Sequence, residues 1–258
     1  MTRHGICFGL NYDATPEARL RGCHNDVLNI LKLLKSPKYH FDDVRIFLDN
    51  VVNPRTTARH MLEEINDLAT RSWSDDLELA WIHYSGHGCS AFDRNGDEAD
   101  RKDECLVPSD FKQSGVVRDD LINRALKRFN PKTRVICIFD CCHSGTIADL
   151  KYVYKNTRKP DVFKTWTNPT VPCPSPVIML SGCMDSQTSA DAYNVQHRNQ
   201  FSGAMTSCML MVLEEHKHEN VKIFELLEDL RKKLKERRFT QIPQLSSSFK
   251  IDEEEELL

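Results

Sequence analysis

The chain has 258 residues, of which 40% are hydrophobic and 28% are charged, and its formal net charge is −3. This length suffices for one domain with a sizeable core, and the composition is ordinary for a soluble globular protein. The near balance of charges disfavours a nucleic-acid-binding protein, which would be strongly basic. No run of about 18 apolar residues occurs, so the sequence also predicts no membrane span.

The sequence contains ten cysteines, and none of them forms a C-x-x-C pair. Several, such as Cys7, Cys137 and Cys208, lie within apolar runs. This pattern is typical of reduced thiols in a cytosolic or nuclear protein rather than of a disulfide framework. The first apolar run, 5–10, is too short for a signal peptide.

Hydrophobic periodicity predicts strands that alternate with helices. Apolar runs indicate buried strands, and apolar residues at helical spacing indicate the helices between them. This alternation predicts an α/β fold with a mostly parallel central sheet and helices on both faces. The expected strands are 4–10, 44–48, 77–84, 105–107, 134–139 and 177–180, and the expected helices are 22–35, 54–69, 119–129, 201–213 and 221–235.

Asn53 and Pro54 predict the start of the second helix, as an N-cap followed by proline at the first helical position. The polar residues 91–103 predict a loop or a short hairpin. Residues 151–176 are basic and then proline-rich, which predicts a long surface loop. Its basic stretch is either a site of self-cleavage or a solvated segment. The acidic residues 252–256 predict a disordered tail.

Two of the predicted strands end in chemically reactive residues. The run 135–139 leads into Asp-Cys-Cys-His-Ser-Gly at 140–145, and the run 79–84 leads into Ser-Gly-His-Gly at 85–88. In an open α/β sheet the carboxyl ends of the strands form one edge, where sites occur. A thiol and an imidazole at that edge are the machinery of a cysteine protease. His87 precedes Cys142 by 55 positions, close to the spacing of about 50 found in caspases.

The stretches 83–88 and 140–145 resemble the paired signature of the metacaspases, and 22–26 resembles their N-terminal motif. The stretches 185–192, 203–206 and 243–247 resemble the small-subunit region of the type I subgroup. The resemblance implies a caspase-like fold with one peptidase domain over 1–250. Within it, residues 1–150 resemble a large subunit, 151–176 a connecting loop and 177–250 a small subunit, and an acidic tail follows at 251–258. We expect no prodomain of the kind common in type I relatives ahead of the first strand, either because the protein lacks one or because the chain is truncated there.

By this resemblance the chain is a cysteine endopeptidase with Cys142 as the nucleophile and His87 as the general acid–base. The backbone amides of Gly88 and Cys142 would form the oxyanion hole. Cys141, at a position that is often serine in the family, is either a passive neighbour or a fallback thiol. A zinc site at 141–143 is disfavoured because consecutive residues rarely converge on one ion.

The resemblance further implies an acidic S1 pocket lined by Cys23, Asp26, Ser85 and Asp140, and hence cleavage after Arg or Lys. A carboxylate beside a thiolate would raise the pKa of the thiol and hinder catalysis, so Asp140 is expected to face a cationic substrate group instead. The alternative for Asp26 is a solvated acid in the first turn of its helix.

Metacaspases are typically activated by calcium, and the matching positions are Asp103, Asp119, Asp120 and Asp149. Carboxylate oxygens suit Ca²⁺, although adjacent acids at 119–120 would also suit a helix start. Residues 93–104 have the acidic spacing of an EF-hand, but Glu98 stands where that loop requires glycine, which excludes an EF-hand.

Two other interpretations stay open. One is a catalytically silent scaffold with the same fold, which the presence of both His87 and Cys142 disfavours. The other is a doubly wound nucleotide-binding protein, for which no G-x-G-x-x-G or P-loop motif is present. We expect a monomer that acts on polypeptides with Arg or Lys at P1, binds no nucleic acid and contacts no membrane.

Overall fold

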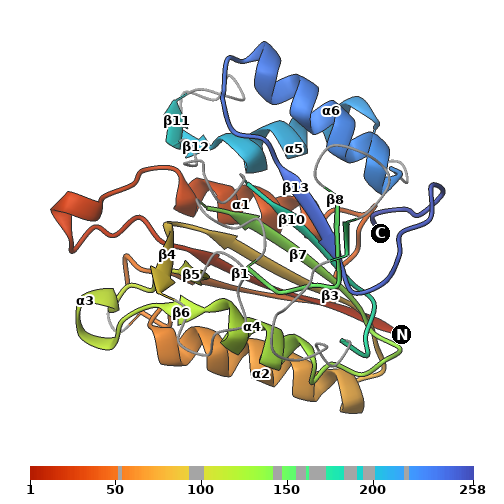
Figure 1. The fold of residues 1–258 in the computed structure, drawn as a ribbon, viewed down its shortest axis with the longest axis horizontal. Coiled ribbons are helices and arrows are strands. Elements are labelled where there is room, and N and C mark those ends of the chain that lie inside the picture. The colour runs from red at the N-terminus through yellow and green to blue at the C-terminus, as the bar shows by residue number, and fades with distance from the viewer. Residues whose placement is uncertain are drawn as a thin grey trace.

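The computed structural model describes residues 1–51, 54–92, 102–141, 147–154, 161–162, 173–182, 191–193, 201–217 and 221–258. An eight-stranded sheet in the order β2-β1-β3-β7-β10-β13-β8-β9 runs through the molecule (Figure 1). The strands from β2 to β10 are parallel, and β13 turns the pairing antiparallel. The strands are β1 (Thr2–Gly9), β2 (Asp43–Leu48), β3 (Leu77–Ser85), β7 (Arg134–Asp140), β8 (Tyr152–Tyr154), β9 (Asp161–Val162), β10 (Val177–Ser181) and β13 (Gln244–Ser247).

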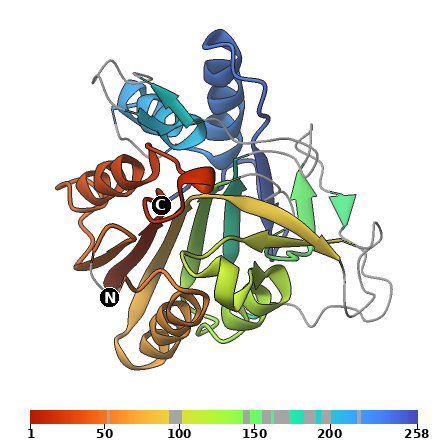
Figure 2. The same cartoon turned by 90° about the vertical axis from the view of Figure 1, so that its left-hand side faces the viewer.

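Helices cover both faces of this sheet, as the sequence predicts. Figures 1 and 2 show α1, α5 and α6 on one face and α2 and α4 on the other. Alternate residues of β3 supply the two cores, with Trp81 packed on the α1 side and Tyr84 on the α2 side. The helices are α1 (Cys23–Leu34), α2 (Ala58–Ser74), α4 (Asp119–Leu126), α5 (Ala204–Glu215) and α6 (Ile223–Glu236). None of the described helices is long and apolar enough to cross a membrane.

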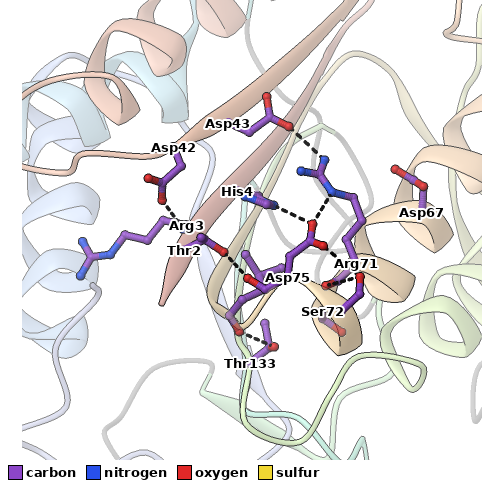
Figure 3. Close-up of polar contacts among 12 residues, drawn as sticks. Thr2, Arg3, His4, Asp42, Asp43, Asp67, Arg71, Ser72, Asp75 and Thr133 are labelled. Carbon is purple, nitrogen blue, oxygen red and sulfur yellow. Dashed lines mark hydrogen bonds and ion pairs between the residues drawn. The ribbon is translucent and has the colours of Figure 1, made fainter.

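The amino-terminal edge of the sheet is fastened by ion pairs (Figure 3). Arg71 of α2 reaches Asp43 of β2 and Asp75, each at 2.9 Å. His4 of β1 lies 4.0 Å from the same Asp75 carboxylate. These contacts tie α2 to two strands at the edge opposite the reactive turns, so this cluster serves the fold.

The predicted start of α2 at Asn53 and Pro54 is wrong. Helix α2 begins at Ala58, and the side chain of Thr57 caps it by accepting a hydrogen bond from His60 N at 3.3 Å. A threonine cap satisfies one of the unpaired N–H groups of the first turn, and Pro54 lies in the described segment ahead of it. Asn53 itself lies outside the described residues.

A small three-stranded sheet lies beside the main one: β4 (Gly88–Phe92), β5 (Lys102–Leu106) and β6 (Val117–Arg118). The antiparallel pairing of β4 with β5 confirms the hairpin alternative for 91–103, while its tip, 93–101, lies outside the described residues. Two short helices lie in connections between these elements. The helix α3 (Phe111–Ser114) lies between β5 and β6 along the chain, and the 3-10 helix η1 (Pro16–Ala18) lies between β1 and α1.

The prediction of one long surface loop over 151–176 is wrong at its beginning. Residues 152–154 form β8, which hydrogen-bonds to β13 within the main sheet, and Tyr154 is fully buried. Its two tyrosines and valine favour a strand. Most of the remaining loop, and with it the question of self-cleavage, lies outside the described residues.

The start of the helix expected at 201 is also shifted. Residues 201–203 form the short strand β12 (Phe201–Gly203), which pairs with β11 (Asp191–Tyr193), and α5 follows it directly.

The acidic tail is ordered, contrary to the sequence-based expectation. Glu255 pairs with Arg134 of β7, and its carbonyl accepts the N–H of Ile223 at 2.9 Å. Leu257 is only 2% exposed and packs into the core beside α6. Apolar burial and backbone pairing therefore hold a segment whose charge alone predicts disorder.

Candidate active site

The two strands that lead into the reactive stretches end side by side at the carboxyl edge of the sheet, as predicted. Ser85 and Asp140 are the last residues of β3 and β7 and are direct neighbours in the parallel register. His87 follows Ser85 by two residues, and Cys141 follows Asp140. Cys141 is fully buried in the core on the α2 side, which favours the passive role over that of a fallback thiol. Cys142 and residues 143–145 lie outside the described residues.

His87 is partly buried and held on several sides. Its Nε2 lies 2.7 Å from the carbonyl oxygen of Ala18, at the end of η1. Because a carbonyl oxygen only accepts hydrogen bonds, Nε2 carries the proton and Nδ1 is the basic nitrogen of the neutral ring. The Tyr12 ring lies against the imidazole, with 4.9 Å between ring centroids.

Ala18 is a functional contact that the sequence analysis missed. Its contribution comes from a backbone carbonyl, which every residue possesses, and it lies 69 positions before His87. No side-chain pattern could have indicated it. The geometry gives the His87 ring a backbone carbonyl as its hydrogen-bond partner.

Asp26 is fully buried, so the solvated alternative for this residue is wrong. Its Oδ2 accepts a hydrogen bond from the hydroxyl of Ser85 at 2.6 Å. The backbone N–H of Gly203 reaches Oδ1 at 3.0 Å and Oδ2 at 2.9 Å. The first-turn carboxylate of α1 thus points at the end of β3, not at solvent.

Asp140 lies beside Asp26 and is 4% exposed. Its Oδ2 accepts the backbone N–H of Thr206 in the first turn of α5 at 2.8 Å. A helix N-terminus carries partial positive charge and suits a carboxylate. Cys23, also buried, begins α1 at the same place, and its N–H donates to the side-chain oxygen of Asn11 at 3.0 Å. The structure therefore brings Ser85, Asp26 and Asp140 together, and Cys23 begins the helix that carries Asp26.

Gly203 is a second residue missed by sequence reasoning. A Cβ atom at this position would lie 2.3 Å from Asp140 Oδ2 and 2.7 Å from Asp26 Oδ2. Any side chain there would collide with both acids. The resemblance at 203–206 was the signal available, but it carried no information on what the glycine contacts.

Three of the four predicted calcium residues come together. The carboxylate oxygens of Asp103, Asp119 and Asp120 lie within 4.8 Å of one another. Burial and the charges of Glu104 and Asp103 raise the pKa of Asp119 to about 8. Crowded, partly buried acids of this kind suit a divalent cation. Arg118 forms an ion pair with Asp103 in the same cluster.

Asp149 is not part of this group of three. Its backbone is tied to the neighbouring helix instead, because Asn123 of α4 donates to the carbonyls of Ala148 at 2.6 Å and Asp149 at 3.4 Å. Gly88, predicted for the oxyanion hole, is the first residue of β4, directly after His87. Asp103 of this acidic group lies on β5, which pairs with the strand that begins at Gly88.

Comparison with known proteins agrees with this arrangement. Residues 3–151 match the family model described as metacaspase, peptidase C14 domain. The chain belongs to the metacaspase family. It is 34% identical to "Metacaspase-3" of Trypanosoma brucei brucei over 97% of this chain and 72% of that protein. It is 32% identical to "Metacaspase-1" of Mycosarcoma maydis over 97% of this chain and 71% of that protein.

A solved structure of protein GSU0716 from Geobacter sulfurreducens superimposes with a TM-score of 0.67 at 21% identity, over 98% of this chain and 95% of that one. This likeness supports the fold alone. Membership of the metacaspase family makes this chain a cysteine-type peptidase of caspase-like fold that acts on polypeptides. Every described cysteine is a thiol rather than half of a disulfide.

Proposed function

We propose that this metacaspase is a calcium-activated endopeptidase that cleaves after Arg or Lys with a Cys142–His87 dyad. The observation that carries the proposal is the buried pair Asp26 and Asp140 at the same sheet edge as His87. The hydroxyl of Ser85 and the N–H groups of Gly203 and Thr206 that reach these acids are neutral donors. Such donors stabilise a carboxylate without cancelling its charge. Two carboxylates at the substrate site would favour a guanidinium or ammonium group and disfavour an aspartyl side chain.

The chemistry follows from the orientation of His87. Nδ1, left basic by the Ala18 contact, accepts the proton of the Cys142 thiol, and the thiolate attacks the scissile carbonyl carbon. The amides of Gly88 and Cys142 donate to the oxyanion that forms. His87 then returns the proton to the leaving amine, and water hydrolyses the acyl-enzyme by the reverse proton path.

Asp103, Asp119 and Asp120 would hold the calcium ion, and Asp149 is the predicted fourth residue. When bound, the cation would offset the mutual repulsion of these acids. Asp103 lies on β5 opposite Ala91 of β4. Because β4 starts at Gly88, a cation bound at Asp103 would restrain the β4–β5 pair and with it the Gly88 amide that is predicted for the oxyanion hole.

Arginyl, lysyl and aspartyl fluorogenic peptides, assayed with calcium and with excess chelator, test the proposal. We expect turnover of the first two only, dependent on calcium, and its loss in Cys142→Ala and His87→Ala. Asp26→Asn keeps the shape of the pocket and removes one charge, so kcat/KM for the arginyl peptide should fall at least about 30-fold. Asp229→Asn, at a partly exposed ion pair with His216, is the matched control.

Turnover of the aspartyl peptide alone would overturn the specificity, and full activity in chelator would overturn the calcium requirement. Labelling by an arginyl chloromethylketone, lost in Cys142→Ala, separates an active enzyme from a silent scaffold. Failure of the wild-type protein both to label and to turn over any peptide would favour the scaffold.

A further inference from the structure

Two tyrosine hydroxyls hold the backbone of His87. The N–H of His87 donates to the Tyr12 hydroxyl at 2.9 Å, and the Tyr84 hydroxyl donates to the His87 carbonyl at 2.7 Å. The Tyr12 hydroxyl in turn donates to the carbonyl of Val107 at 2.7 Å. The two hydroxyl oxygens are 3.1 Å apart, and both tyrosines are buried. Both backbone polar groups of His87 are therefore bound by tyrosine side chains.

Tyr12 also contacts the imidazole itself. Its ring is inclined by 34° to the His87 ring at a centroid distance of 4.9 Å. One side chain thus restrains both the main chain and the ring of His87. With Nε2 bound to Ala18, the rotation of the imidazole about its side-chain bonds is restricted from two directions.

Tyr12 adopts a backbone conformation that tyrosine rarely takes. Its φ is 56°, in the left-handed region, where a bulky residue persists only if its surroundings hold it. Asp49 supplies that support by accepting the N–H groups of Asn11 at 3.0 Å and Tyr12 at 2.6 Å. His24 lies 2.6 Å from the same carboxylate. A strained residue held in this way beside a reactive histidine points to function.

Gly86 makes room for the hydroxyls. A Cβ atom there would lie 2.6 Å from the Tyr84 hydroxyl and 3.0 Å from that of Tyr12. The glycine before His87 is therefore needed for the two hydroxyls to reach the next peptide units.

We propose that Tyr12 and Tyr84 are positioning residues that set the placement of the His87 imidazole for proton transfer. The proposal rests on the role of His87 in the proposed function. Proton transfer requires donor and acceptor within hydrogen-bond reach, and small displacements of a reacting group reduce the rate strongly. Burial raises the pKa of both hydroxyls well above the usual range, so the two tyrosines stay neutral hydrogen-bonding groups.

The test compares Tyr12→Phe and Tyr84→Phe with the wild-type protein on an arginyl peptide with calcium. Each variant keeps the ring and loses one contact to His87. We expect kcat to fall on the order of 10-fold while KM stays within about twofold. Tyr154→Phe is the matched control. Tyr154 lies on β8, away from the site, and its buried hydroxyl accepts a hydrogen bond from the N–H of Ile251 at 2.7 Å. This substitution should leave kcat unchanged.

A double-mutant cycle with His87→Ala separates positioning from a general loss of structure. If Tyr12 acts through the imidazole, Tyr12→Phe lowers the residual rate of His87→Ala no further. An equal loss in both backgrounds, or values of kcat close to wild type for both tyrosine variants, would overturn the proposal. Wild-type activity in His87→Ala would instead overturn the role of His87. If Tyr12→Phe does not fold, Tyr84→Phe decides by the same measurements.

Discussion

The carboxylates of Asp26 and Asp140 meet at Gly203. Gly203 N–H binds the first acid, and the N–H of Thr206 binds the second. Like charges held this close repel one another, and the N-terminus of α5 offsets some of that repulsion. Strand β12 and helix α5 therefore complete the surroundings of two acids that belong to α1 and β7.

Gly203→Ala should damage this pocket selectively. The new Cβ would lie 2.3 Å from Asp140 Oδ2 and 2.7 Å from Asp26 Oδ2, so the carboxylates would have to move. We expect kcat/KM for the arginyl peptide to fall roughly 10- to 100-fold, mainly through KM. Steady-state kinetics on that peptide, with thermal unfolding in parallel, measure this effect.

Gly5→Ala is the matched control for that substitution. Its Cβ would approach only flexible side-chain atoms, 3.3 Å from Leu34 Cδ1 and 3.5 Å from Val44 Cγ1, in β1 away from the reactive edge. Its KM should equal that of the wild-type protein. An unchanged KM in Gly203→Ala as well would show that the glycine does not shape the substrate pocket.

Calcium activation should depend on pH through Asp119. Burial, with the charges of Glu104 and Asp103, raises the pKa of this carboxyl to about 8, so protons compete with the cation below that pH. The calcium concentration for half-maximal activity should rise by up to about tenfold per pH unit below about 8. Activity titrations at about pH 6.5 and 8.5 bracket that pKa and measure the change. The double variant Asp119→Asn with Asp120→Asn should not respond to calcium. If the calcium concentration for half-maximal activity of the wild type does not change with pH, protonation of Asp119 does not compete with calcium binding.

His83 should make the protein sensitive to acid. This histidine is fully buried in β3, and burial lowers its pKa to about 3. The unfolded chain takes up a proton near pH 6.5 whereas the folded one does not, so its contribution to stability is lost as the pH falls from about 6.5 towards 3. Between about pH 6.5 and 4.5 the loss should be roughly 2–3 kcal/mol greater in the wild type than in His83→Phe.

Urea unfolding at the two pH values gives these free energies. His216→Gln, which changes a partly exposed histidine paired with Asp229, should keep the wild-type difference. Equal pH dependence in the wild type and His83→Phe would rule out His83 as the source, because carboxylates common to both variants would then explain the loss.

The C-terminal segment should contribute to stability. Leu257 is 2% exposed and its N–H bonds to Val221 O at 2.9 Å. Leu257→Ala should therefore lower the free energy of unfolding by about 2–3 kcal/mol. Glu253→Ala, on the exposed acidic stretch, should change it by less than about 0.5 kcal/mol. Chemical denaturation of both variants checks this, and equal stabilities would mean that the segment is dispensable.

Local signals in the sequence were sufficient for the five parallel strands of the main sheet and for the edge at which the reactive residues lie, but β13 was missed. Continuous apolar runs such as 135–139 identify strands buried on both faces, and the residues after them must share one edge because the strands are parallel. The order of the motifs also indicated the family. In the acidic tail, tertiary packing overrides the charge pattern. At β8 the strand-forming residues 152–154 were hidden within a basic and proline-rich stretch that was predicted as one loop.

Only the tertiary structure decided how the site is assembled. In the fold, the Ala18 carbonyl accepts a hydrogen bond from Nε2 of His87, and the hydroxyls of Tyr12 and Tyr84 bind the backbone of His87. Gly203 lies against the carboxylates of Asp26 and Asp140. These contacts join residues up to 177 positions apart and use backbone groups or the absence of a side chain. A sequence states which side chains are available, but it does not state which peptide group lies opposite them, because that depends on how the helices pack across the sheet.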